Sequence, residues 1–160
     1  MKILYTENLS KHYGKGESLV RALDNVDLEI NEGEFVAIIG KSGSGKSTLL
    51  HMIGGLDIPT SGKVYIDNKN IFTLKEEELA VFRRRKIGFI FQDYNLLDNM
   101  KLMDNIALPL ALGKKKSKEI EAKVFSIAKK FGLENHLDKY PYQLSGGQKQ
   151  RGAAARSLIT

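Results

Sequence analysis

Apolar residues along this chain fall into short runs and alternations that predict an α/β fold. Residues 35–39 are wholly apolar and 86–91 largely so, a pattern typical of strands buried on both faces of a parallel sheet. Apolar and polar residues alternate over 26–30, which predicts a half-exposed antiparallel strand. Two more strands are expected at 2–8 and 63–66. Both buried and half-exposed strands are thus expected.

Helical periodicity marks four further segments, of which one is clearly amphipathic. Apolar residues recur with helical spacing over 118–131, which predicts a helix with Ser117 as its N-cap and Gly132 just after its end. Ser145 is expected to cap a last helix, and 93–113 to mix turns with short helical stretches. The remaining predicted helices cover 48–53, 76–85 and 146–158.

Composition and charge limit the kinds of protein that this chain can be. Its 160 residues suffice for one domain with a core, and no apolar run is long enough to span a membrane. Cysteine is absent, which excludes disulfides and thiolate metal sites and suits a reducing cytoplasm. The net charge of +6 gathers in two basic clusters, 83–86 and 114–118. They are either solvated or face a polyanion or membrane; since no nucleic-acid-binding motif accompanies them, no nucleic-acid partner is expected.

Residues 40–47 read Gly-Lys-Ser-Gly-Ser-Gly-Lys-Ser, which fits the phosphate-binding pattern G-x-x-x-x-G-K-[ST] at every fixed position. This octet follows the predicted strand at 35–39 and precedes the predicted helix at 48–53, whose N-terminal dipole favours an anion. A plain Gly/Ser surface turn is the alternative, and the strand-loop-helix context argues against it. By itself the octet fits any phosphate-binding protein, kinases and GTPases included.

Each fixed residue of the octet has a physical task at a polyphosphate. Its glycines let backbone N–H groups approach phosphate oxygens without hindrance from a Cβ. Lys46 can place a mobile positive charge over the β and γ phosphates, and the Ser47 hydroxyl can bind Mg²⁺. The glycines concerned are Gly40, Gly43 and Gly45.

A second candidate anion site lies at residues 144–148, which read Leu-Ser-Gly-Gly-Gln. A capping serine and two glycines at a predicted helix N-terminus direct backbone donors and the positive end of the helix dipole outward. An ordinary cap and turn before a helix has the same composition, so the residues alone leave both interpretations open.

The pentapeptide 144–148 resembles the signature motif of the ATP-binding cassette (ABC) ATPases, at the separation from the octet found in that family. Gln92 resembles the family's Q-loop glutamine. Tyr13 resembles the aromatic residue that stacks on adenine, although an ordinary surface tyrosine is the alternative. Four segments resemble the branch that serves lipoprotein release, macrolide export and antimicrobial-peptide resistance: 54–57, 59–62, 82–84 and 88–92.

The resemblance implies a particular α/β fold. It is a P-loop NTPase (RecA-like) core with an N-terminal antiparallel β subdomain and a helical subdomain, incomplete at the C-terminus. Residues 1–160 would form a single, truncated nucleotide-binding domain. Within it, 1–92 would hold the P-loop core and β subdomain, and 93–160 the helical subdomain with the signature helix.

The resemblance also implies that ATP and Mg²⁺ bind between two protomers arranged head to tail. The P-loop of one protomer and the signature motif of the other would hold the same nucleotide, with Ser145 and Gly147 donating to the γ-phosphate. Lys46 and Gln92 would act in catalysis, and Ser47 and Gln92 would bind the metal. The residues expected to contact ATP are Tyr13, Gly40, Lys41, Ser42, Gly43, Ser44, Gly45, Lys46, Ser47, Thr48, Ser145, Gly146, Gly147 and Gln148.

A family member of this kind is a cytoplasmic ATPase subunit, peripheral on the inner face of the membrane. It couples ATP binding and hydrolysis to substrate movement by an integral membrane permease, here expected to be export or membrane extraction. Residues 93–112 would receive a helix of the permease. Candidate contacts, or alternatively plain core residues, are Leu96, Leu97, Met100, Leu102 and Met103.

Two features that the family needs for hydrolysis are not found in the sequence. No apolar strand ends in the Asp-Glu pair that supports Mg²⁺ and acts as general base, and no histidine follows the signature motif. We therefore expect a truncated chain that binds nucleotide weakly and hydrolyses almost none, with its strand at 35–39 poorly covered and prone to association. The alternatives are a nucleotide-binding regulatory module that does not hydrolyse ATP, and a soluble ABC protein that acts on ribosomes or DNA.

Overall fold

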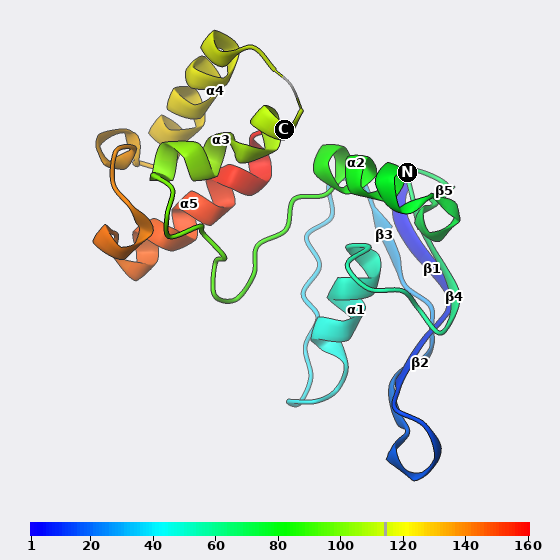
Figure 1. The fold of residues 1–160 in the computed structure, drawn as a ribbon. Coiled ribbons are helices and arrows are strands. Elements are labelled where there is room, and N and C mark those ends of the chain that lie inside the picture. The colour runs from blue at the N-terminus through cyan, green and yellow to red at the C-terminus, as the bar shows by residue number, and fades with distance from the viewer. Residues whose placement is uncertain (114) are drawn as a thin grey trace. The chain divides into compact units, whose positions relative to one another are not determined.

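The chain divides into two units, residues 1–83 and 84–160, each with its own packing (Figure 1). The structure, a computed structural model, describes residues 1–113 and 115–160; Lys114, part of the second basic cluster, lies outside them. Within the described residues, no helix combines the length and the apolar character needed to cross a bilayer.

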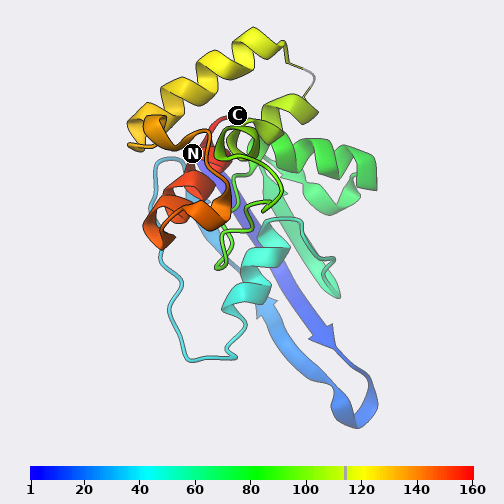
Figure 2. The same cartoon turned by 60° about the vertical axis from the view of Figure 1, so that its left-hand side comes forward.

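The first unit is built on one long strand, β1 (Lys2–Tyr13), which pairs antiparallel with three others. β4 (Ser61–Ile66) lies along one edge of β1, and β5 (Lys69–Asn70) pairs with β4. Along the other edge, β2 (Val20–Val26) and β3 (Glu29–Asn31) follow one another (Figure 2). These strands confirm the predictions made for 2–8 and 63–66.

The break between β2 and β3 has a local cause. The buried Thr6 of β1 donates from Oγ1 to the Val26 carbonyl at 2.8 Å and accepts from the Leu28 N–H at 2.9 Å. Its hydroxyl thereby takes the place of a regular rung of the ladder. The alternation over 26–30, predicted as one strand, is divided between β2 and β3, and that prediction is wrong in its boundaries.

The core of the first unit forms where the sheet meets helix α1 (Lys46–Ile53) and the short 3-10 helix η2 (Ile71–Thr73). Helix α2 (Glu76–Lys86) confirms the helix predicted at 76–85, and its Leu79 and Phe82 are half-buried. Burying one large aliphatic side chain contributes roughly 1.5–3 kcal/mol. The buried apolar residues of this unit are Leu9, Leu23, Leu49, Met52, Val64, Ile66 and Ile71.

The two apolar runs predicted as buried parallel strands are not strands. Residues 35–39 lie outside any helix or strand, with Phe35 99% and Ile39 90% exposed. Residues 87–91 are likewise irregular after the end of α2, and Ile90 is 48% exposed. A central strand needs hydrogen-bonding neighbours on both sides. Among the described residues no strand pairs with either run, and this accounts for the wrong prediction.

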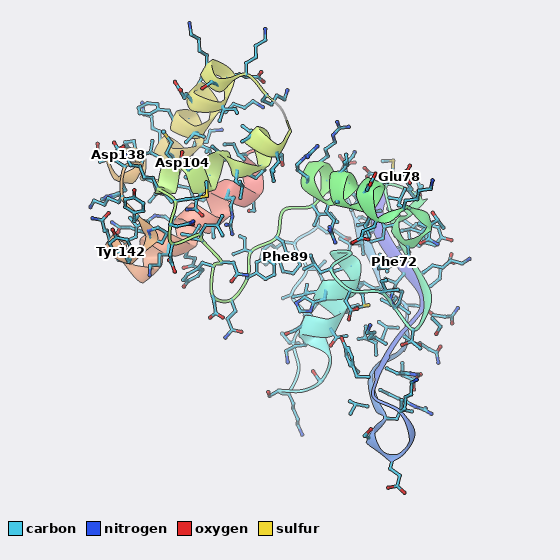
Figure 3. All side chains as sticks on the ribbon, viewed as in Figure 1. Phe72, Glu78, Phe89, Asp104, Asp138 and Tyr142 are labelled. Atoms are coloured by element: carbon cyan, nitrogen blue, oxygen red, sulfur yellow. The ribbon has the colours of Figure 1, made fainter. Side chains whose placement is uncertain are left out.

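The second unit packs three helices around one apolar core. They are α3 (Leu102–Leu112), α4 (Ser117–Lys130) and α5 (Gly146–Leu158). Short 3-10 turns join α4 to α5, and the labelled Asp138 and Tyr142 belong to this connection (Figure 3). The core consists of Leu102, Ile106, Leu110, Val124, Ala128, Leu133, Leu144, Ala155 and Ile159.

The helix predictions for this unit are confirmed apart from one cap and one underestimate. The amphipathic helix over 118–131 is α4, and Gly132 follows its C-cap with φ +63° as predicted. The prediction of Ser117 as the N-cap is wrong, because α4 starts at Ser117 and Lys116 is the N-cap. The Ser117 hydroxyl donates to Glu121 at 3.2 Å instead. α3 is a full helix with Pro109 inside it, where only short helical stretches were predicted.

Candidate functional site

The octet 40–47, hereafter called the phosphate-binding loop after the sequence pattern that it fits, is anchored to the sheet at Gly45. A Cβ on Gly45 would stand 2.2 Å from the carbonyl oxygen of Ala22 in β2, so the loop passes closer to the strand than any side chain allows. Gly45 also has φ +86°, in the left-handed region that favours glycine, and it is the N-cap of α1. The loop therefore leads directly from the sheet into a helix N-terminus.

Lys46, the first residue of α1, turns back over its own loop. Its Nζ donates to the carbonyl oxygens of Gly40 at 2.9 Å and Lys41 at 2.7 Å. These bonds place the ammonium group across the start of the loop. A compact positive charge on a flexible stem can move from carbonyl oxygens to phosphate oxygens at little cost.

Backbone donors converge on the same place. The first bond inside α1 runs from the Leu49 N–H to the Gly45 carbonyl at 2.8 Å, so the N–H groups of Lys46, Ser47 and Thr48 lie at the open end of the helix. They combine with the helix dipole to favour an anion. Ser47 is exposed, and its hydroxyl is a hard oxygen ligand of the kind that Mg²⁺ accepts alongside phosphate oxygens. The exposed flank of the loop is formed by Lys41, Ser42, Gly43 and Ser44.

Tyr13 lies at the same end of the sheet as this loop. It pairs with Val20 of β2, two residues from the Ala22 that Gly45 approaches. Tyr13 is 42% exposed, with the Lys11 ammonium 5.0 Å from the centroid of its ring. Tyr13 is thus more tightly placed than an ordinary surface tyrosine, and its stacking on adenine stays a prediction.

Asp57 holds Tyr13 and Lys11 together, a contact that the sequence interpretation missed. Its carboxylate accepts from Lys11 Nζ at 2.9 Å and from the Tyr13 hydroxyl at 3.1 Å. The hydrogen bond from Lys11, followed by those from the Ile58 N–H and from Tyr13, holds the pKa of Asp57 below its ordinary value. Asp57 was noticed only as part of the segment 54–57, and no local pattern connects it to β1.

The second motif, 144–148, forms a complete capping box at the start of α5. The Gln148 N–H donates to Ser145 Oγ at 3.3 Å, and the Ser145 N–H donates to Gln148 Oε1 at 2.8 Å. The predicted cap at Ser145 and the predicted helix are confirmed. Gly146 and Gly147 are exposed, so their N–H groups are open at the helix end.

The Gln148 side chain is held from both of its ends. Because its Oε1 accepts from Ser145, its Nε2 is the donor to His136 Nε2 at 3.1 Å. This assigns the neutral histidine proton to Nδ1, which is buried without a partner among the described residues. Sequence reasoning did not find His136, since only the tertiary structure brings the two residues together.

Gln92 is exposed and opens a tight turn, residues 92–95, in the second unit. The Tyr94 N–H donates to the Phe91 carbonyl at 3.0 Å, and the Asn95 N–H donates to the Asp93 carbonyl at 2.7 Å. The predicted site residues therefore divide between the units. Tyr13 and the phosphate-binding loop belong to 1–83, whereas Gln92 and the 144–148 motif belong to 84–160.

A family model described as ABC transporter matches residues 23–160. The chain belongs to the ABC transporter family. It is 44% identical to the lipoprotein-releasing system ATP-binding protein LolD of Buchnera aphidicola, over 98% of this chain and 69% of LolD. It is 43% identical to the bacitracin export ATP-binding protein BceA of Halalkalibacterium halodurans, over 99% of this chain and 63% of BceA. The predicted resemblance to the lipoprotein-release and antimicrobial-peptide branch is thereby confirmed.

The fold also matches a solved ABC cassette. The dimeric post-hydrolysis structure of MJ0796 bound to ADP and Pi superposes with a TM-score of 0.90 at 46% identity, covering 98% of this chain and 69% of that one. The predicted P-loop NTPase fold is confirmed by this likeness. The chain spans between 61% and 69% of the length of four curated relatives that it matches.

Proposed function

We propose that this chain is the ATP-binding part of a transporter subunit that couples ATP binding and hydrolysis to substrate movement, as export or membrane extraction. The observation that carries the proposal is the geometry at α1. Its open N–H groups, the Lys46 ammonium and the exposed Ser47 hydroxyl gather at one helix end. That set offers donors for phosphates and an oxygen for a divalent cation.

Nucleotide would lie along the phosphate-binding loop with its base beside Tyr13. The N–H groups of the loop would bind phosphate oxygens, and Lys46 would leave the Gly40 and Lys41 carbonyls for the β and γ phosphates. Ser47 would bind Mg²⁺, which supplies charge neutralisation of the phosphates, and Gln92 would complete its shell.

A head-to-tail dimer would complete each site. Ser145 supports this role, because its Oγ accepts from the Gln148 N–H and so keeps its own O–H free to donate outward. The exposed Gly147 N–H would be the second donor to the γ-phosphate. Donors fixed before the reaction stabilise charge in a phosphoryl-transfer transition state. The matching MJ0796 cassette is described as a dimer, which favours this arrangement.

The transport partner would be an integral membrane permease that contacts the segment 93–112. Leu102 is fully buried and Met103 packs on the core, so core packing accounts for both. Leu97, 42% exposed, with Leu96 and Met100 beside it, remains a candidate contact. The subunit would act at the cytoplasmic face of the membrane and would not require nucleic acid.

A non-hydrolysing nucleotide-binding module is the second candidate. It is favoured by one observation, that no apolar strand within these 160 residues ends in Asp-Glu. The 160 residues alone would then bind nucleotide and lack the general base. Protein expressed from the complete gene distinguishes the two functions: turnover near 1 s⁻¹ supports the ATPase, and turnover at the uncatalysed level supports the module.

Titration of nucleotide tests the binding site directly. Lys46→Ala is expected to weaken ATP binding about 10- to 100-fold, because it removes charged hydrogen bonds to phosphate. The matched control is Lys130→Ala, on the exposed last turn of α4, which should leave the Kd unchanged. Equal affinity in the Lys46→Ala protein and the parent would overturn the proposed site.

A further inference from the structure

Arg156, near the end of α5, holds the turn at residues 92–95. Its guanidinium donates from one nitrogen to the Asn95 carbonyl at 2.7 Å and from the other to the Tyr94 carbonyl at 2.8 Å. The contact joins positions that are 61 and 62 residues apart along the chain. Both partners lie in the second unit, and the sequence interpretation assigned Arg156 no task.

The turn has a backbone that needs such support. Tyr94 has φ +62° and Asn95 φ +44°, in the left-handed region. Asparagine tolerates this conformation, but a bulky tyrosine adopts it only where its surroundings impose it. The two carbonyls that Arg156 binds belong to these two residues, so the arginine acts on the strained part of the turn.

The guanidinium is committed to this contact. Burial of the side chain lowers the pKa of Arg156, since a charge withdrawn from water is disfavoured. A desolvated cation stays in place only where hydrogen bonds compensate the lost hydration. The two carbonyl bonds provide that compensation.

A second side chain fixes the chain directly after the turn. The fully buried Asn105 of α3 accepts from the Leu97 N–H at 2.7 Å and donates to the Leu97 and Met100 carbonyls, both at 3.1 Å. Arg156 and Asn105 therefore hold successive stretches of the segment after Gln92. Gln92 itself stays exposed at the start of the held segment.

We propose that Arg156 is a positioning residue that fastens the Gln92 turn to α5, so that Ser145 and Gln92 are carried by one rigid body. The proposal rests on the function proposed above. At 1.5 Å per residue, about 16 Å of helix separates Ser145 from Arg156. In the proposed head-to-tail dimer, Ser145 would serve the nucleotide of the partner, and Gln92 would serve the nucleotide bound by its own P-loop. A shift of α5 at the nucleotide that Ser145 contacts would therefore also move Gln92 at the other nucleotide.

Hydrogen exchange tests the fastening without any nucleotide. In protein expressed from the complete gene, Arg156→Met keeps an unbranched apolar stem and removes the donors of the side chain. The amides of Tyr94 and Asn95 should exchange about 10-fold faster or more, since local opening becomes easier. The Leu97 amide, held by Asn105, should change less, and Arg85→Met, an exposed arginine of the same unit, should change neither. Unchanged exchange at Tyr94 and Asn95 overturns the proposal.

Arg156→Lys guards against a folding defect. If Arg156→Met speeds exchange throughout 84–160, the methionine variant cannot separate a folding defect from loss of the contact with the turn. Arg156→Lys separates them, because it keeps the charge and can bind only one carbonyl well. It is expected to raise exchange at Tyr94 and Asn95 to an intermediate level and leave α4 unaffected. Parent-like exchange at the turn in the lysine variant would overturn the proposal.

Kinetics then separate positioning from simple support of the fold. With activity counted per bound nucleotide, Arg156→Met should lower kcat about 10- to 100-fold with little change in the Kd for ATP, as misplacement of catalytic groups does. A residue that only stabilises the fold would lower Tm and leave kcat per site unchanged, which would contradict the proposal. A parent protein without ATPase activity would instead overturn the proposed function, while the exchange result still decides the fastening.

Discussion

Gly45 decides, as a single residue, how the phosphate-binding loop meets the sheet. Two constraints coincide on it: a left-handed backbone with φ +86° and the Ala22 carbonyl at 2.2 Å from any added Cβ. Gly43 carries the first constraint alone, with φ +78° and open space within 4 Å. The two glycines of one loop therefore form a natural comparison.

Gly45→Ala should destabilise the first unit far more than Gly43→Ala. The left-handed backbone alone costs an alanine about 1–2 kcal/mol, and the collision with a carbonyl that cannot move freely should bring the Gly45→Ala loss to about 3 kcal/mol or more. Urea unfolding followed by an optical probe in the first unit measures both. Equal losses in the two variants would show that the contact with β2 is unimportant.

Asn105 organises an element, the irregular segment that enters α3. Three backbone carbonyls and one N–H form hydrogen bonds with this one amide, which has no exposure to water. Nothing in the local sequence marks it, because an asparagine that follows an aspartate within a helix usually indicates a surface position.

Asn105→Ala should destabilise the second unit by about 2–4 kcal/mol, because it removes a fully buried amide and with it the side-chain partner of the Leu97 N–H and the Met100 carbonyl. Thermal unfolding detects the loss as a lower Tm. Asn135→Ala, at an exposed position, is the matched control and should stay within about 0.5 kcal/mol of the parent. A small effect at Asn105 would mean that water replaces the amide.

Elements defined by local signals could be predicted, and those defined by distant partners could not. α4 and α5 carry their periodicity and their capping signals within a few residues, and the phosphate-binding loop carries its pattern in eight. The run 35–39 has the composition of a central strand, but strand formation depends on neighbours that the described residues do not provide. Arg156 binds Tyr94 and His136 binds Gln148, and both partners are too far away in the sequence for a local pattern to reveal the contact.

At the scale of the whole molecule, the exposed apolar run 35–39 is the segment most prone to association with other chains. Phe35 is almost fully exposed and Ile39 nearly so, beside further apolar residues with free backbone groups. Exposed segments of this composition pair with other chains.

The 160-residue chain should therefore self-associate, and Phe35→Ser with Ile39→Ser should reduce it. Light scattering across a concentration series measures the mean mass. Ile58→Ser, the control, removes an apolar residue outside this run that is 71% exposed, and it should leave association unchanged. A parent chain that remains monomeric across the series would contradict the role given to this run.

The pairing of β1 with β4 also determines when, during synthesis, this part of the sheet can form. Leu4 pairs with Ile66, so the first strand made waits for a partner that leaves the ribosome some 60 residues later. At about 5–20 residues per second, that wait lasts several seconds. During this wait, the edge of β1 (residues 2–13) that will pair with β4 has unpaired backbone groups. Until then β1 can pair only with β2 and β3, of which β2 folds back after the turn at Gly16–Ser18.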